Sequence, residues 1–166
     1  MTLAEVVAAL YAAVAGHAHG GYGWRTPHGG GARQETTSIV ADARDPCVIT
    51  VAVRSTNYFS DRGPQSGYRN RRSRWESTMR WRVPLAELRA IDVNEDDNRE
   101  GGAPRVEARA RGKLSWELDP PPIGANEVGS GVDTKLDFLV DDKKGGRRIA
   151  VAWERAVAAC AKRRAR

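Results

Sequence analysis

The sequence feature that most constrains the fold of this chain is an alternation of apolar and polar residues that recurs after residue 35. In the run Arg74–Val83, RWESTMRWRV, one set of alternate residues is mostly apolar and the other set is polar or charged. Successive side chains of a β-strand point to opposite faces of a sheet, so this period of two predicts a strand with one buried and one wet face. One-sided strands are typical of antiparallel sheets, because strands of parallel α/β sheets read as continuous apolar runs.

The same alternation recurs in five further runs, and a seventh strand is a candidate at Glu35–Ala43. The five runs are Cys47–Val53, Leu88–Val93, Arg105–Arg111, Lys113–Leu118 and Leu136–Val140. Turn-forming residues separate the later runs at Asn94–Pro104, Asp119–Asp133 and Asp141–Gly146. We therefore expect six or seven antiparallel strands between residues 35 and 141, arranged as a sheet or a barrel.

A short amphipathic helix is predicted at residues 2–15. Thr2 and Glu5 have the spacing of a capping box, in which each side chain binds the backbone N–H of the other residue. An apolar stripe follows at helical spacing, and Gly16 provides a stop. The residues of this stripe are Leu3, Val6, Val7, Leu10 and Val14.

A second amphipathic helix is predicted at residues 147–162, followed by a basic tail at 163–166. Its apolar stripe consists of Ile149, Ala152, Trp153, Ala156, Val157, Cys160 and Ala161. A helix with one apolar face needs a surface to cover, so we expect this helix to cap the sheet. With 166 residues the chain is long enough to bury one core, and the prediction is a single, mainly β domain of the α+β type.

A glycine-rich segment at residues 16–34 holds every histidine of the chain: His17, His19 and His28. Three imidazoles could bind zinc, copper or nickel, but no nearby carboxylate is available to orient the rings. A phosphate-binding loop is excluded, because a helix precedes the segment and no Gly-Lys-Ser/Thr follows it. We expect a flexible connector between the first helix and the strands, with Trp24 as its anchor on the fold.

The two cysteines, Cys47 and Cys160, both fall on predicted apolar stripes. Their spacing excludes the local pattern of a zinc finger or a thioredoxin-type site. Either the two residues meet in a disulfide bond, or they are two buried free thiols, and the sequence alone favours the free thiols. The compartment follows the same alternative, because a disulfide would indicate an exported protein and free thiols a cytoplasmic one.

Positive charge is concentrated in the segment from Arg54 to Arg82. The chain has 27 Lys and Arg against 21 Asp and Glu, a net charge of +6 that favours acidic partners. Eight arginines lie in this segment, with the aromatic residues Tyr58, Phe59 and Tyr68 between them. Guanidinium groups bind phosphate oxygens in pairs, and aromatic rings stack on bases or lie at a membrane interface. The alternative is a solvated strand face, whose charges keep an exposed sheet from aggregating.

Three segments carry a resemblance to a known fold: Leu3–Leu10, Trp81–Leu88 and Ile149–Cys160. With them the chain resembles the pleckstrin-homology-like superfold, and in particular uncharacterised bacterial proteins of that shape with an added N-terminal helix. The resemblance implies a binding scaffold without an assigned ligand, and it carries no catalytic residue to this chain. In pleckstrin-homology domains that bind phosphoinositides, basic residues of an early loop hold the head group, and Arg72-x-Arg74 is loosely similar to them.

We therefore expect a non-enzymatic binding module without a cofactor, which engages an acidic protein surface or an anionic lipid head group. The expected ligand-binding residues are Tyr68, Arg69, Arg71, Arg72, Arg74, Arg80 and Arg82. The alternative is a nucleic-acid-binding β-barrel protein that uses the same arginines with Tyr58, Phe59 and Tyr68. No catalytic constellation is visible, and no apolar run is long enough to predict a transmembrane segment.

Overall fold

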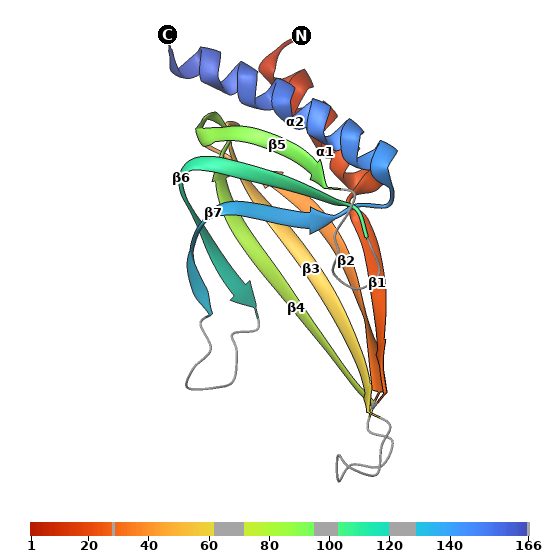
Figure 1. Ribbon diagram of the computed structural model, residues 1–166. Coiled ribbons are helices and arrows are strands. Elements are labelled where there is room, and N and C mark those ends of the chain that lie inside the picture. Colours follow the sequence, from red (N-terminus) through yellow and green to blue (C-terminus); the bar gives the residue numbers. More distant parts are fainter. Residues whose placement is uncertain (28, 62–71, 95–102, 120–128, 166) are drawn as a thin grey trace.

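The structure, a computed structural model, describes residues 1–27, 29–61, 72–94, 103–119 and 129–165. Seven antiparallel strands form one sheet, with a helix at each end of the chain, which confirms the predicted α+β, mainly β class (Figure 1). The elements are α1 (Leu3–His17), β1 (His19–Thr26), β2 (Gly29–Ala41), β3 (Val48–Asp61), β4 (Arg72–Pro84), the 3-10 turn η1 (Leu85–Glu87), β5 (Leu88–Asn94), β6 (Arg105–Asp119), β7 (Ser130–Leu139) and α2 (Lys143–Arg164).

The sheet consists of two meanders joined through β6. Strands β1 to β4 pair in chain order and form a long blade, which runs from the helices to a distal end at the β1–β2 turn (Figure 1). The second meander is β5–β6–β7. The first part of β6 pairs with β5, and its residues Ser115–Asp119 pair with Thr78–Arg82 of β4. The blade therefore has a proximal half attached to the rest of the fold and a distal half that extends beyond it.

The hydrophobic core lies where the two helices cover the proximal half of the sheet (Figure 1). In α2 the ring of Trp153 is fully buried and stacks on Phe138 of β7, with 5.8 Å between the ring centroids. The predicted stripe of α1 is confirmed at Val6, Val7, Leu10 and Val14, which are all buried. The inward residues of β3, β4 and β6 complete the core. None of the helices in the described ranges is long and apolar enough to cross a membrane.

Both helices begin with the side-chain caps that their sequences provide. Thr2 accepts from the N–H of Glu5 and the Glu5 carboxylate accepts from the N–H of Thr2, so the predicted capping box is confirmed. The predicted start of the second helix at residue 147 is wrong, because α2 begins at Lys143 behind an Asp142 cap. Asp142 Oδ1 accepts a hydrogen bond from the N–H of Gly145 at 2.6 Å. This cap stabilises the first turn of α2, whose residues Gly145 and Gly146 were predicted to form a flexible turn.

A disulfide bond joins Cys47, just before β3, to Cys160 in α2. The interpretation as two free thiols, which the sequence alone favoured, is therefore wrong for this structure. The two residues are separated by 113 positions, and local spacing gives no information on whether such distant residues meet. A bridge that closes a loop of this size stabilises a fold by about 4–5 kcal/mol in the chain-entropy model. It fixes α2 on the proximal half of the blade.

The prediction of a flexible connector at residues 16–34 is also wrong. Its first residues complete α1, and its remainder forms the antiparallel hairpin β1–β2, in which Trp24 lies opposite Gly31. Glycine in a strand normally costs stability, but a neighbouring aromatic ring that covers it restores packing. A second pair of this kind, Trp116 opposite Gly131, occurs between β6 and β7. The predicted strand at Glu35–Ala43 falls on the longer strand β2, which ends at Ala41.

Candidate functional site

Part of the segment predicted to bind a ligand lies outside the described residues, namely Tyr68, Arg69 and Arg71. Arg72 is the first residue of β4. Burial alternates as the sequence predicted from Arg80 to Val83, whereas Trp75, on the face predicted to be buried, is 51 % exposed. The exposed arginines of the outward face are Arg74, Arg80 and Arg82. Thr50, Ala52 and Arg54 lie on the same face of the neighbouring strand β3.

Carboxylates on the same face already pair with most of these arginines. Glu76 receives two of them, Arg54 Nη2 at 3.2 Å and Arg74 Nη2 at 2.7 Å, and Arg80 Nη1 lies 3.4 Å from Asp119 Oδ2. The side chains are 40–65 % exposed. Exposed ion pairs of this kind contribute about 0–1 kcal/mol, so an external anion can compete for them. Because two arginines share Glu76, this part of the face keeps a net positive charge.

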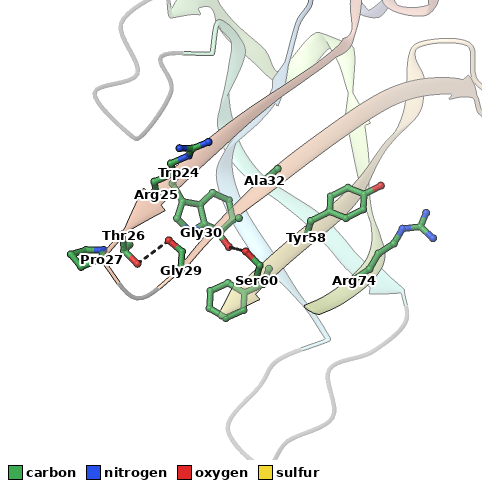
Figure 2. Close-up of a pocket in the computed structure, with 12 residues that line it drawn as sticks. Trp24, Arg25, Thr26, Pro27, Gly29, Gly30, Ala32, Tyr58, Ser60 and Arg74 are labelled. Carbon is green, nitrogen blue, oxygen red and sulfur yellow. Dashed lines mark hydrogen bonds between the residues drawn. The ribbon is translucent and has the colours of Figure 1, made fainter. Parts of the chain in front are cut away.

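The distal end of the blade contains a hollow with a volume of about 600 Å³, which we call the distal hollow (Figure 2). Its lining includes Trp24, Arg25, Gly31, Tyr58, Phe59 and Arg74. Tyr58, Phe59 and Arg74 come from β3 and β4. Trp24, Arg25 and Gly31 belong to the glycine-rich hairpin that was expected to be a connector. The hollow therefore joins the predicted arginine strand to residues that the sequence did not single out.

The Trp24 ring occupies space in the distal hollow that is available only because residue 31 is glycine. A Cβ atom at Gly31 would lie 2.2 Å from the Trp24 ring and 2.6 Å from the carbonyl oxygen of Tyr58. The indole ring therefore lies directly on the backbone of β2. Tyr22 flanks it on the same strand, with 6.1 Å between the ring centroids. The Trp24 ring thus packs directly on Gly31, and the neighbouring glycines Gly29 and Gly30 line the hollow without filling it.

The aromatic side chains of the distal hollow lie on both faces of the blade. Tyr58 is opposite Arg74 in the register of β3 and β4, and the guanidinium carbon of Arg74 is 5.7 Å from the Tyr58 ring centroid, within the range of a cation–π contact. Phe59 is the next residue, so it points to the other face, where Gly31 and Trp24 lie. Both rings are accessible, with Tyr58 39 % and Phe59 40 % exposed.

A polar network separates the distal hollow from the apolar core. Glu35 is 4 % exposed, and its Oε2 accepts from Arg33 Nε at 2.7 Å while its Oε1 accepts from the N–H of Leu139 at 3.1 Å. Arg33 also donates to Ser55 Oγ at 2.8 Å and lies 3.4 Å from Asn57 Oδ1. A buried carboxylate needs such partners to offset its loss of hydration. The network fixes β2 against β3 and β7 and supports the distal half of the blade.

His17 has a structural position at the junction of the two helices. Its Nδ1 lies 2.8 Å from Asp141 Oδ2, and Arg148 Nη1 lies 3.4 Å from its Nε2. Because a guanidinium group can only donate, Nε2 is the acceptor and Nδ1–H donates to the carboxylate. Burial raises the pKa of the Asp141 carboxyl, but hydrogen bonds from His17 and from the N–H of Asp142 lower it, and the net pKa lies below its ordinary value.

The three histidines considered as metal ligands do not form a described cluster. His17 contacts Asp141, His19 is an exposed residue of β1 opposite Thr36, and His28 lies outside the described residues. Within the ranges that the structure describes, no group of three or more histidine, cysteine, aspartate or glutamate residues could hold a metal ion. The candidate functional site is therefore the distal hollow with the adjoining arginine face.

Comparisons with known proteins identify no relative of this chain. No protein-family model, no curated protein and no solved structure matches it. The resemblance to the pleckstrin-homology-like superfold thus stays a prediction. The function has to be argued from the residues of the candidate site.

Proposed function

We propose that this chain is a non-enzymatic binding module that engages anionic lipid head groups through the distal hollow. The observation that carries the proposal is the position of Arg25 and Arg74 beside three aromatic side chains, Trp24, Tyr58 and Phe59, at the far end of the blade. Aromatic side chains of this kind lie at the boundary between head groups and acyl chains. Basic residues beside them bind anionic head groups, each contributing about 1 kcal/mol near such a surface.

The distribution of the aromatic rings favours a lipid surface over a nucleic acid. Tyr58 lies on the face of Arg74, whereas Phe59 lies on the opposite face with Trp24. A nucleic-acid strand that follows the arginine face would stack on Tyr58 and miss Phe59. An acidic protein surface that covers that face would miss Phe59 in the same way. A lipid head-group layer surrounds an inserted tip, so it contacts both faces at once.

The order of the strands supports the related proposal that the chain has the pleckstrin-homology-like superfold. A four-stranded meander, a three-stranded meander and a C-terminal helix follow one another along the chain. The strand order supports a fold only, and the proposed ligand rests on the side chains that line the distal hollow.

Vesicle co-sedimentation tests the proposed function. We expect the chain to bind vesicles that contain phosphatidylglycerol and to leave vesicles of phosphatidylcholine alone unbound. The double variant Arg25→Gln and Arg74→Gln removes two cations, which corresponds to about 2 kcal/mol, or about a thirtyfold weaker binding.

The matched control for this experiment is the double variant Arg111→Gln and Lys113→Gln, which removes the same charge from exposed positions on β6. Binding of this control should fall much less. Equal losses in the two variants would indicate attraction to net charge and would contradict a site at the distal hollow. Binding of single-stranded oligonucleotides without binding of anionic vesicles would favour the nucleic-acid alternative.

A further inference from the structure

The two helices lie at the opposite end of the molecule from the distal end of the blade (Figure 1). A groove is present between α1 and α2. We call it the helix groove. Its apolar floor is formed by Val6 and Ala9 of α1 and by Val151 and Ala152 of α2, and its volume is about 390 Å³. Val151 is 46 % exposed although it lies in the middle of a helix. At Val151 the floor therefore presents apolar surface that no described part of the chain covers, whereas Val6 is buried.

Four cations line the helix groove, and all of them come from α2: Lys144, Arg147, Arg148 and Arg155. None of the residues that line the groove is acidic, among those that the structure describes. Glu154 is the one carboxylate in the sequence of α2, and it lies beside Leu88 to Ile91 on a different side of the helix. The lining of the groove therefore carries a net positive charge.

The charge of the helix groove is one-sided. Helix α1 contains no lysine or arginine, so its side of the groove is apolar or small, whereas the α2 side is basic. A flat anionic membrane would contact both helices, but only α2 has basic side chains that complement its charge. A bound helix with an acidic flank on one side and an apolar face in the middle would match both sides.

The small residues of the floor also suit a helix. Ala9 and Ala152 allow the backbone of a third helix to approach α1 and α2 at the usual distances of about 8–10 Å. The lining residues of α2 extend from Lys144 to Arg155, and eleven steps with a rise of 1.5 Å each span about 16 Å, or about three helical turns. This length is enough for apolar anchors at i, i+3 or i+4, and i+7 of a bound helix.

We propose that the helix groove binds an acidic amphipathic helix of a partner protein. The apolar stripe of that helix packs on Val151, Ala152 and Ala9, and its glutamate or aspartate residues face Lys144, Arg148 and Arg155. Arg148 Nη1 also lies 3.4 Å from His17 Nε2. This inference does not depend on the function of the distal hollow, which uses other residues.

Fluorescence anisotropy with the full chain and two labelled synthetic peptides tests this inference. Both peptides are amphipathic helices with the same leucine stripe, and one has glutamate where the other has lysine on the flank. We expect the glutamate peptide to bind and the lysine peptide not to bind. The double variant Lys144→Glu and Arg155→Glu should bind the glutamate peptide about tenfold more weakly or worse. The same variant should gain binding of the lysine peptide.

Two further variants separate a specific site from general attraction to a basic helix. Val151→Asp changes an exposed position of the floor and should abolish binding of the glutamate peptide while the circular dichroism spectrum stays unchanged. Lys162→Glu changes the charge of the same helix outside the groove and should leave binding nearly unchanged. The inference is overturned if Lys162→Glu weakens binding of the glutamate peptide as much as the double variant Lys144→Glu and Arg155→Glu does. It is also overturned if the two peptides bind equally, or if anionic vesicles bind at the groove and the peptide does not.

Discussion

The proximal and distal halves of the blade use the same four strands in different ways. In the proximal half, inward side chains such as Val51 and Val83 are fully buried under two helices, and a disulfide bond holds one of these helices in place. In the distal half no described helix covers the strands, and the inward positions hold Arg33, Glu35 and aromatic rings. The buried core is thus concentrated in the proximal half, and the distal half holds the accessible aromatic and basic side chains on which the proposed function depends.

The largest effect in this comparison is expected from the disulfide bond of the proximal half. The double variant Cys47→Ala and Cys160→Ala should lower the free energy of unfolding by about 4–5 kcal/mol, because the unfolded chain gains loop entropy. Urea denaturation monitored by circular dichroism measures this change. The mass of the non-reduced protein should also lie two hydrogens below the mass of the reduced protein. Equal masses, with no effect of the substitutions on stability, would contradict the bond between Cys47 and Cys160.

A smaller effect is expected from Gly31 in the distal half. Gly31→Ala places a Cβ against the Trp24 ring and should lower the free energy of unfolding by about 1–3 kcal/mol, the usual cost of overpacking. The same denaturation experiment measures it. Gly112→Ala is the matched control, since no atom lies within 4 Å of the Cβ that it adds. If both substitutions have the same effect, the Trp24 ring does not lie on Gly31 and the distal hollow is not built as described.

The smallest effect is expected from the His17–Asp141 contact at the helix junction. The pKa of Asp141 is lowered in the folded protein, so its contribution to stability is present above the ordinary pKa of 3.8 and is lost as the pH falls through the lower folded value. Asp141→Asn should therefore lower the free energy of unfolding at neutral pH by about 1 kcal/mol or less. The difference from the parent protein should vanish in acid. A difference that grows as the pH falls would contradict the sign of this shift.

The two halves of the blade also differ in how far the sequence predicted them. The proximal half follows from periodicity, because a residue such as Trp81 or Trp153 is buried wherever an apolar stripe meets a sheet. The hairpin at the distal half was missed, because single-residue preferences place glycine in turns. Tyr22, Trp24 and Thr26 do alternate, and the cross-strand pairing of Trp24 with Gly31 makes this alternation a strand. That pairing is a property of two segments together and is not visible in either alone.

The candidate site was predicted in part for the same reason. Arg74, Arg80 and Arg82 were identified because charge on alternate residues of a strand marks its outward face. Arg25 and the packing of Trp24 on Gly31 were not identified, because both depend on the β1–β2 hairpin, which the sequence did not predict. Three of the four cations of the helix groove lie within the predicted helix, whereas Lys144 lies in the segment that was read as a turn, and their common side is defined by the position of α1. Contacts between distant segments, such as Cys47 with Cys160, decide these features, and local patterns carry no information on them.

Vesicle binding by two single variants at neighbouring positions tests whether the distal end of the blade inserts into a lipid surface. Tyr58→Ser and Phe59→Ser change rings on opposite faces of the distal end, and both rings are about 40 % exposed. We predict that each substitution weakens binding to phosphatidylglycerol vesicles, because a head-group layer surrounds the tip, and that the thermal midpoint changes little. A loss of binding in Tyr58→Ser with no change in Phe59→Ser would show that the ligand contacts the arginine face alone. That result would contradict insertion of the distal end into a lipid surface.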